Sequence, residues 1–176
     1  MSYNYVQAFK EGHYYNEIVA GYLRSHGINC VAPELKIAQN SQEVKEMTLS
    51  EKDVVISASG SVIEVKSNRR EFFWEPSAFP YKSIIVDTVS SYESKEVKPI
   101  AYVFVSRTNG AMVTIGSSTF KKWKKVSLYD KYQEITDDFY LADKSEIRPI
   151  SDLVRHILDG QNTTNNRGRN SGRLIK

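Results

Sequence analysis

The pattern of apolar and polar residues predicts an amphipathic helix at the start of the chain. Within residues 11–26 the apolar side chains recur at the spacing of one helical face, which is typical of a helix packed on a core. They are Tyr15, Ile18, Val19, Tyr22 and Leu23. Gly27 follows the last turn, where a residue in the left-handed conformation is commonly needed.

A series of strands is expected next. Residues 30–38 form a strand interrupted by Pro33, which suits an edge or a bulge. The runs 53–57 and 61–66 are rich in β-branched residues and are separated by Ala-Ser-Gly, which predicts a hairpin. The run 99–106 is the clearest strand, because its unbroken apolar character indicates cover on both faces.

The remaining elements are expected to be short. In chain order they are a strand or short helix over 81–90, an antiparallel edge strand over 111–115, a short helix over 118–125, a strand over 139–142 and a helix over 150–158. Residues 160–176 have almost no apolar content and are expected to be disordered. The sequence therefore predicts one α/β domain over 1–159, with a central mixed sheet flanked by helices, and a basic tail.

The hairpin decides whether three reactive side chains meet. Strand alternation places Glu64 and Lys66 on one face. If Ser59 and Gly60 form a two-residue turn, Asp53 lies opposite Lys66 and joins that face. A loop one residue longer would turn Asp53 away.

Grouped in this way, the three side chains suit metal-assisted hydrolysis. Neighbouring carboxylates at Asp53 and Glu64 repel each other unless a divalent cation joins them, and their hard oxygens suit Mg²⁺ or Mn²⁺. The carbonyl of Val65 is a candidate further ligand. Lys66 could position or deprotonate a metal-activated water, or offset charge on a phosphate. The competing interpretation is a surface hairpin with a solvated Glu/Lys pair.

These residues and the order of elements resemble the PD-(D/E)xK nuclease superfamily. The likeness covers roughly residues 11–106: the helix GHYYNEIVAGYLRSHG, a strand, Asp53 followed by VVI, IEVK ending in Lys66, and the strand AYVFVS. It implies a restriction-endonuclease-like αβββαβ core, with metal bound by Asp53 and Glu64 and hydrolysis assisted by Lys66. The segments IIVDTV, KPIAYVFVSRTNGAM and FYLADKSEIRP look like those of small nuclease-like proteins of bacteriophages, including endonucleases and resolvases.

The superfamily usually has a glutamate on its first helix that faces the site, and Glu17 is the candidate by position. At 100° per residue, Glu17 lies almost opposite the apolar stripe of the helix. Counting back from Val19 and Leu23 points to Asn16 instead. The sequence leaves open whether Glu17, Asn16 or neither of them faces the site. Asp87 is either a third acid of the site or a turn or capping residue.

The charge distribution limits how DNA could be bound. The net charge is +3, but residues 167–176 hold four basic and no acidic residues, so the rest of the chain has a net charge of −1. DNA contacts must therefore come from local clusters. The candidates are Arg69, Arg70 and Lys82 after the hairpin, and Lys121, Lys122 and Lys124 around Trp123. Trp123 could stack on a base or, as we prefer, anchor a short helix to the core.

Composition narrows the remaining possibilities. A single cysteine, Cys30, excludes an internal disulfide, and the three histidines have no zinc-site spacing. No apolar run reaches the ~18 residues of a membrane span, and the first residues lack a signal-peptide pattern. We expect a cytoplasmic Mg²⁺-dependent DNA endonuclease without membrane contact or organic cofactor, and a homodimer if two strands are cut. The rivals are an inactive nuclease-fold protein that binds nucleic acid or acts in assembly, and an interaction domain using the aromatic segment 72–79.

Overall fold

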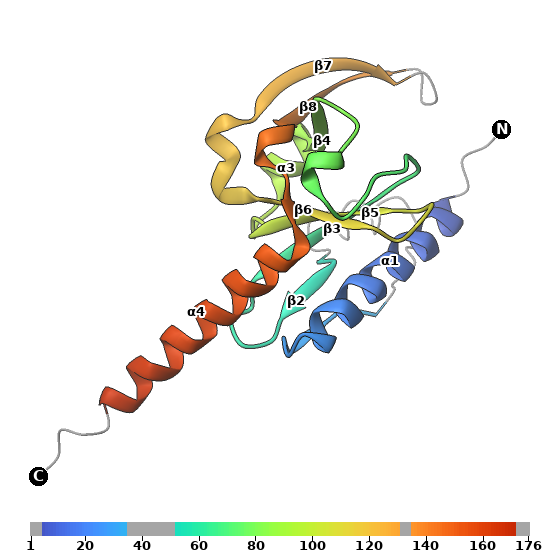
Figure 1. Cartoon of the computed structure of the whole chain (residues 1–176). Coiled ribbons are helices and arrows are strands. Elements are labelled where there is room, and N and C mark those ends of the chain that lie inside the picture. The colour runs from blue at the N-terminus through green and yellow to red at the C-terminus, as the bar shows by residue number, and fades with distance from the viewer. Residues whose placement is uncertain (1–4, 35–51, 131–134, 172–176) are drawn as a thin grey trace, which may run out of the picture.

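Two β-sheets organise the computed structural model, which describes residues 5–34, 52–130 and 135–171 (Figure 1). The larger sheet contains, in spatial order, β1 (Cys30–Val31), β2 (Val54–Ile56), β3 (Val62–Asn68), β5 (Ala101–Ser106), β6 (Met112–Gly116) and β9 (Arg148–Pro149). The smaller sheet contains β4 (Ser83–Thr88), β8 (Ile135–Asp143) and β7 (Lys124–Asp130). The helices are α1 (Tyr5–Ser25), α3 (Val89–Ser94) and α4 (Ile150–Ser171), with 3₁₀ turns η1 (Pro76–Ala78), η2 (Ser117–Lys122) and η3 (Lys144–Glu146). This is an α/β structure with a mixed sheet, as the sequence predicts.

Helix α1 begins earlier than expected and ends where the sequence indicates. Gly27 has φ +82°. The N–H of Ile28 donates to the carbonyl of Leu23 at 3.1 Å, and that of Gly27 donates to Arg24 at 3.0 Å. These two bonds form the Schellman arrangement that closes a helix through a left-handed residue. The apolar stripe of α1 is thereby directed onto the sheet, with Val19 and Leu23 fully buried.

The larger sheet separates two apolar cores. On one face, α1 and α4 pack against strands of the sheet, and the buried side chains include Leu23, Val54, Ile63, Val103 and Ile157. On the other face, the smaller sheet, α3 and η2 take the place that helices alone were expected to fill, and the buried side chains include Phe79, Val86, Tyr102, Phe104 and Ala142. Figure 1 shows the helices α1 and α4 below the larger sheet and the strands β4, β7 and β8 above it. Every residue of β5 is buried, which confirms the expected cover on both faces.

The β2–β3 hairpin forms in a different register from the predicted one. Val54 pairs with Ile63, and the N–H of Ile56 donates to the carbonyl of Ser61 at 2.9 Å, so the turn takes residues 57–60. This register differs from the prediction by two residues, which is one full period of strand alternation. Asp53 therefore keeps the predicted face but lies across from Glu64 instead of Lys66.

Other elements depart from the sequence-based expectations. Strand β6 is antiparallel to β5 as predicted, but it is not an edge, because Thr114 pairs with Arg148 of β9. Strand β8 is longer than the predicted 139–142, and α4 continues through Ser171 although a disordered segment was expected from residue 160. Of the expected strand over 30–38, Cys30–Val31 is a strand and residues 32–34 are not, whereas residues 35–38, like 172–176, lie outside the described ones. Among the helices that the structure describes, none combines the length and apolar composition needed to cross a bilayer.

Candidate active site

Asp53 lies where β2 stops pairing with β3. If the ladder continued beyond Val54, Lys52 would lie opposite Val65 and accept its N–H. Asp53 Oδ2 accepts that N–H instead, at 2.7 Å. Asn16 of α1 donates from Nδ2 to the other oxygen, Oδ1, at 3.2 Å. The carboxylate is therefore held by one backbone and one side-chain donor at the opening between two strands.

Glu64 and Lys66 extend from the same face of β3, beside this opening. Lys66 Nζ lies 2.8 Å from Glu64 Oε1, and 34% of the lysine side chain is exposed against 12% of the glutamate. A second ammonium, Lys95 Nζ, lies 3.5 Å from the same oxygen. Glu64 thus has two cations near one carboxylate oxygen.

Asp87 joins the cluster from the smaller sheet, as the first of the two alternatives for this residue requires. Its side chain is 4% exposed and accepts from Lys66 Nζ at 3.3 Å and from Lys95 Nζ at 2.8 Å. The hydroxyl of Tyr102 donates to it at 3.0 Å, as does the N–H of Thr88. Thr88, and not Asp87, caps α3 by accepting the N–H of Ser91. Asp87 therefore connects the two sheets at the candidate site.

The pKa of each carboxyl follows from its surroundings. Burial, followed by repulsion from Glu64, raises the pKa of Asp53 to about 7, against the smaller opposing effects of the Val65 N–H, Lys66 and Asn16. Burial would also raise the pKa of Asp87, but Lys66 and Lys95 outweigh it and hold that pKa below its usual range. The two acids differ because Asp87 has ammonium partners, whereas among the described residues no lysine or arginine nitrogen lies within 4 Å of Asp53.

Lys66 and Tyr102 are both held in their protonated forms. Burial would lower the pKa of Lys66, but the carboxylates of Glu64 and Asp87 overcome this and raise it. Burial and the same two carboxylates raise the pKa of the Tyr102 phenol. With all groups ionised, the three carboxylates of Asp53, Glu64 and Asp87 and the two ammonium groups of Lys66 and Lys95 give the cluster a net charge of −1.

The first helix presents Asn16, not Glu17, to Asp53. Glu17 forms an ion pair with Arg24 at 3.1 Å, and both side chains are 46% exposed. Arg107, at the end of β5, fixes the N-terminal half of α1: it donates to Ser67 Oγ of β3 at 2.8 Å and pairs with Glu11 of α1. These contacts orient α1 so that Asn16 lies at the opening beside Asp53, whereas Glu17 lies outside the cluster.

The chemistry of the donor set fits a divalent cation in part. Within the described residues, no three His, Cys, Asp or Glu side chains form a group that could hold an ion alone. Asp53 and Glu64 supply two hard oxygens across the strand opening. In an antiparallel ladder the N–H and C=O of one residue point to the same neighbouring strand, so the carbonyl of Val65 is directed to the side where Asp53 lies. Two carboxylates and one carbonyl are a plausible Mg²⁺ ligand set once water completes it.

The basic residues predicted to bind nucleic acid fall into two groups. Arg69, Arg70 and Lys82 are exposed on the segment after β3, and the Arg70 guanidinium lies 4.8 Å from the centre of the Tyr81 ring. Of the other group, Lys122 pairs with Glu146 at 3.0 Å, and Lys121 and Lys124 are exposed.

Trp123, at the centre of the second basic group, is 8% exposed and packs against aromatic rings of the core. Its nearest ring neighbours are Tyr92, Tyr102, Phe120 and Tyr140. This confirms the structural interpretation of Trp123 over base stacking.

Sequence reasoning missed Lys95 and Tyr102. Lys95 follows α3 in a polar stretch without a distinguishing pattern. Tyr102 had a usable signal, because β3 and β5 pair in parallel with Glu64 beside Tyr102. A tyrosine in a buried strand adjacent to the IEVK strand needs a hydrogen-bond partner for its hydroxyl, and the buried acid Asp87 provides one.

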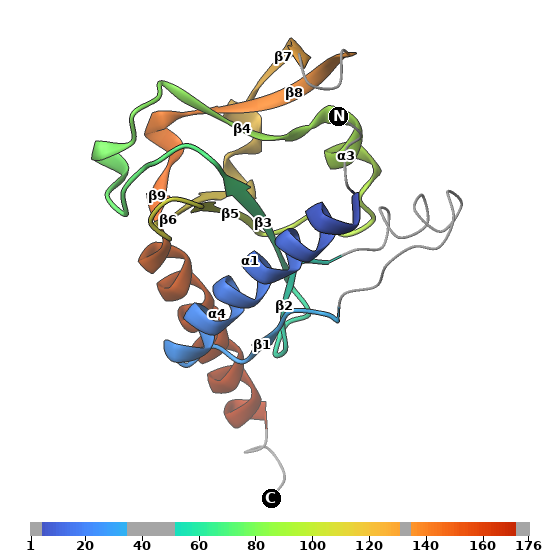
Figure 2. The same cartoon turned by 90° about the vertical axis from the view of Figure 1, so that its right-hand side faces the viewer.

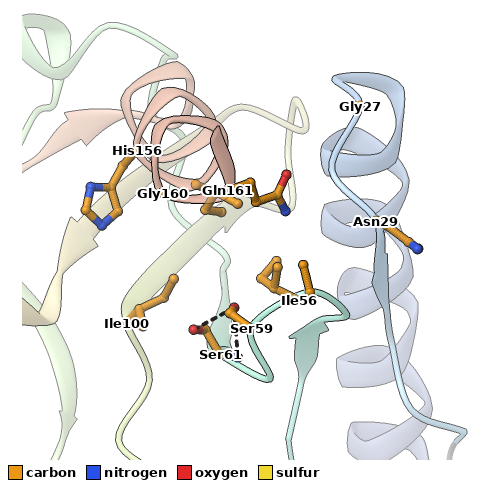
Figure 3. A pocket seen from close by; sticks show the side chains of 11 residues that line it. Gly27, Asn29, Ile56, Ser59, Ser61, Ile100, His156, Gly160 and Gln161 are labelled. Atoms are coloured by element: carbon orange, nitrogen blue, oxygen red, sulfur yellow. Dashed lines mark hydrogen bonds between the residues drawn. The ribbon is translucent and has the colours of Figure 1, made fainter. Parts of the chain in front are cut away.

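A separate hollow lies away from this cluster, at the turn end of the β2–β3 hairpin. It measures about 520 Å³ and is bordered by α4, the turn and the C-terminal end of α1 (Figure 3). Its polar lining consists of side chains such as Asn29, Ser59, Ser61 and Gln161, with His156 at its side. The described residues of its lining include no carboxylate and no ammonium group, so it lacks the acids that a metal-assisted hydrolysis needs.

Comparison with family models, with curated proteins and with solved structures found no match for this chain. What can be argued about function therefore comes from the geometry of the cluster that joins Asp53, Glu64, Lys66, Asp87 and Lys95.

Proposed function

We propose that the chain is a Mg²⁺-dependent DNA endonuclease that hydrolyses phosphodiester bonds. One observation carries the proposal: Asp53, at the opening between β2 and β3, lies across from Glu64 with Lys66 on the same face. The order of elements supports a restriction-endonuclease-like αβββαβ core, since α1 precedes an antiparallel meander of β1 to β3, and β5 follows α3 and returns parallel to β3. Strand β4, which lies between β3 and α3 in the chain, belongs to the smaller sheet. The same proposal places the protein in the cytoplasm, where the thiol of Cys30 stays reduced.

In the proposed mechanism Asp53, Glu64 and the Val65 carbonyl would hold the cation. Mg²⁺, when bound, would polarise the scissile phosphate and lower the pKa of a coordinated water. Asn16 and the Val65 N–H orient the Asp53 carboxylate. Because its pKa is raised, Lys66 remains an ammonium and serves as a positive charge beside the phosphate, which favours charge stabilisation over proton abstraction among its possible roles.

Asp87 acts indirectly in this scheme. Each of its two oxygens accepts from one lysine, so it sets the positions of Lys66 and Lys95. Tyr102 and the Thr88 N–H fix Asp87 in turn. Lys95 adds a second positive charge close to Glu64, where negative charge develops during phosphoryl transfer.

One observation favours a second candidate, an inactive nuclease-fold protein that binds nucleic acid. Lys66 and Lys95 both lie within 3.5 Å of Glu64 Oε1. Two ammonium groups beside one carboxylate neutralise it and weaken its attraction for a metal ion. In this alternative the lysines replace the cation permanently, and the protein binds nucleic acid without cutting it.

The experiment that separates the two candidates is a cleavage assay with matched variants. Linear, supercoiled, branched and single-stranded DNA are incubated with the protein and Mg²⁺, Mn²⁺ or EDTA. We expect cutting that requires the metal and falls by about 100-fold or more in Asp53→Asn, Glu64→Gln and Lys66→Ala, since each removes a ligand or charge used in the transition state. Glu17→Gln is the control and should keep activity, because Glu17 contacts Arg24 outside the cluster. Cutting that persists in EDTA or in all three variants contradicts the mechanism.

A further inference from the structure

A groove leads away from Lys66 and Asp87 along β4. Its first part, of about 230 Å³, is lined by these two residues and by Phe104 and Phe139. Its second part, of about 550 Å³, is lined by residues of the 69–82 segment and of the smaller sheet. Asn68 and Ile85 line both parts, so the two parts adjoin. Figure 2 shows the course of the 69–82 segment from β3 to β4.

One wall of the groove is apolar and open to solvent. Ile85 is 46% exposed and Leu128 38% exposed. Ile85 pairs directly with Leu141 in the smaller sheet, so these two side chains share a face. This exposed apolar wall lies next to the reactive cluster. It therefore favours a ligand with flat, weakly hydrated groups that can pack against the wall.

Cations lie along the groove but are few. Lys66 stands at its inner end, and Arg70 and Lys82 line its outer part. The Arg70 guanidinium over the Tyr81 ring adds a planar surface on which a base can stack. The groove thus offers positive charge for a few phosphates and apolar or planar surface for bases.

Single-stranded nucleic acid fits this combination, and a duplex does not. A duplex keeps its bases stacked inside and presents two charged backbones, which the apolar wall could not complement. The net charge of −1 outside residues 167–176 gives little general attraction for such a polyanion. An unpaired strand exposes its bases, which stack on aromatic and guanidinium surfaces without regard to sequence.

We propose that the groove from Lys66 to Leu128 binds single-stranded nucleic acid, with bases on the Ile85–Leu128 wall and phosphates near Arg70 and Lys82. The inference rests on the proposed nuclease function, since it supplies the substrate class for that site. On this basis the substrate is an unpaired strand or a single-stranded branch.

The test measures binding without cutting. Fluorescence anisotropy is recorded in EDTA with labelled single-stranded dT20, a 20-base-pair duplex and the same duplex with a single-stranded overhang. We expect dT20 and the overhang to bind at least about tenfold more tightly than the duplex. With two groove cations, Arg70 and Lys82, contacting phosphates, log K for dT20 should fall against log salt with a slope of about −1.4.

Groove variants locate the site. Ile85→Ser with Leu128→Ser, and separately Arg70→Ala, should each weaken dT20 binding about tenfold or more. Val31→Ser is the matched control, because Val31 is also exposed and apolar (51%) but lies on the edge strand β1. Circular dichroism confirms that the variants are folded.

Three results would overturn the groove proposal: duplex binding as tight as single-strand binding, single-strand binding unchanged in the groove variants, or no binding of either. A concentration-dependent dimer that Ile85→Ser with Leu128→Ser dissociates would also overturn it, by assigning the wall to a second copy of the chain. The nuclease proposal fails separately, in the cleavage assay with Mg²⁺. If the groove variants cut DNA as well as the wild type does, the nuclease proposal stands and the groove proposal fails.

Discussion

The carboxylate of Asp53 accepts the backbone N–H of Val65 at 2.7 Å, at the point where β2 ceases to pair with β3. A side chain thus replaces the backbone acceptor that the next residue pair of the ladder would have provided. The Val65 N–H of β3 thus keeps a hydrogen-bond acceptor although the two strands separate at this point.

Asp53→Asn should change the pH dependence of stability. The pKa of Asp53 is about 7 in the folded chain against 3.8 as the ordinary value. The folded state therefore holds the proton more strongly, and this group makes folding less favourable as pH rises from about 4 to 7. The asparagine side chain carries no charge at either pH, so the free energy of unfolding at pH 8 should rise by up to about 4 kcal/mol, with little change at pH 4.5. Urea denaturation at both pH values measures it. An equal effect at both would show that the pKa is not raised.

Divalent cations should stabilise the wild-type chain and do so more strongly at higher pH. A ligand that binds only the folded state stabilises it by mass action, about 2.7 kcal/mol at 100 times its dissociation constant. The proton on Asp53 competes with the metal, so the rise in melting temperature with Mn²⁺ or Mg²⁺ should be larger at pH 8 than at pH 6. Glu64→Gln should lose the response, and Glu17→Gln should keep it. A response that both variants share would place the ion elsewhere.

Asp87→Asn should destabilise the protein because it leaves two ammonium groups short of a buried partner. Removing one member of a buried ion pair costs about 3–5 kcal/mol, and the partial exposure of Lys66 places the expected loss near the lower end. The double variant Asp87→Asn, Lys95→Met should recover part of the loss, which a double-mutant cycle quantifies. Asp152→Asn is the control, since its partner Arg155 is 72% exposed and such pairs contribute little. A loss below about 1 kcal/mol for Asp87→Asn would show that the cluster is not coupled.

The two tryptophans should behave differently when truncated. Trp123→Ala removes a buried ring from an aromatic core and should cost about 3–5 kcal/mol. Trp74 is 43% exposed and stacks on Tyr22 at a ring distance of 6.0 Å, so Trp74→Ala should cost roughly 1 kcal/mol or less. Urea unfolding followed by circular dichroism compares them. Similar costs would mean that the segment containing Trp74 is part of the core.

The sequence was informative where short-range periodicity determines the outcome. The apolar stripe of α1 and its end before Gly27 follow from local spacing, and the burial of β5 follows from its composition. The hairpin is more instructive. Its register was predicted wrongly by two residues, yet Asp53, Glu64 and Lys66 still share a face, because strand alternation repeats every two residues.

The parts that could not be predicted depend on contacts between distant segments. The smaller sheet pairs β4 with β8, which are separated by more than 45 residues, and nothing local indicates that pairing. Lys95 enters the site only because α3 follows the end of β4. The choice between Asn16 and Glu17 depends on how α1 is rotated against β3, and the Arg107 contacts to Glu11 and Ser67 that fix this rotation have no local signal.

Part of the groove wall comes from a later part of the chain than the cluster. All of the reactive side chains, and Ile85 of the wall, lie between Asn16 and Tyr102, whereas Leu128, Phe139 and Leu141 of the wall come later. The contact surface can therefore change in sequence, and with it the nucleic acid that is preferred, while every reactive group stays as it is. Selection acting on substrate choice would leave part of its record in β7 and β8, and selection on reactivity would leave its record between residues 16 and 102.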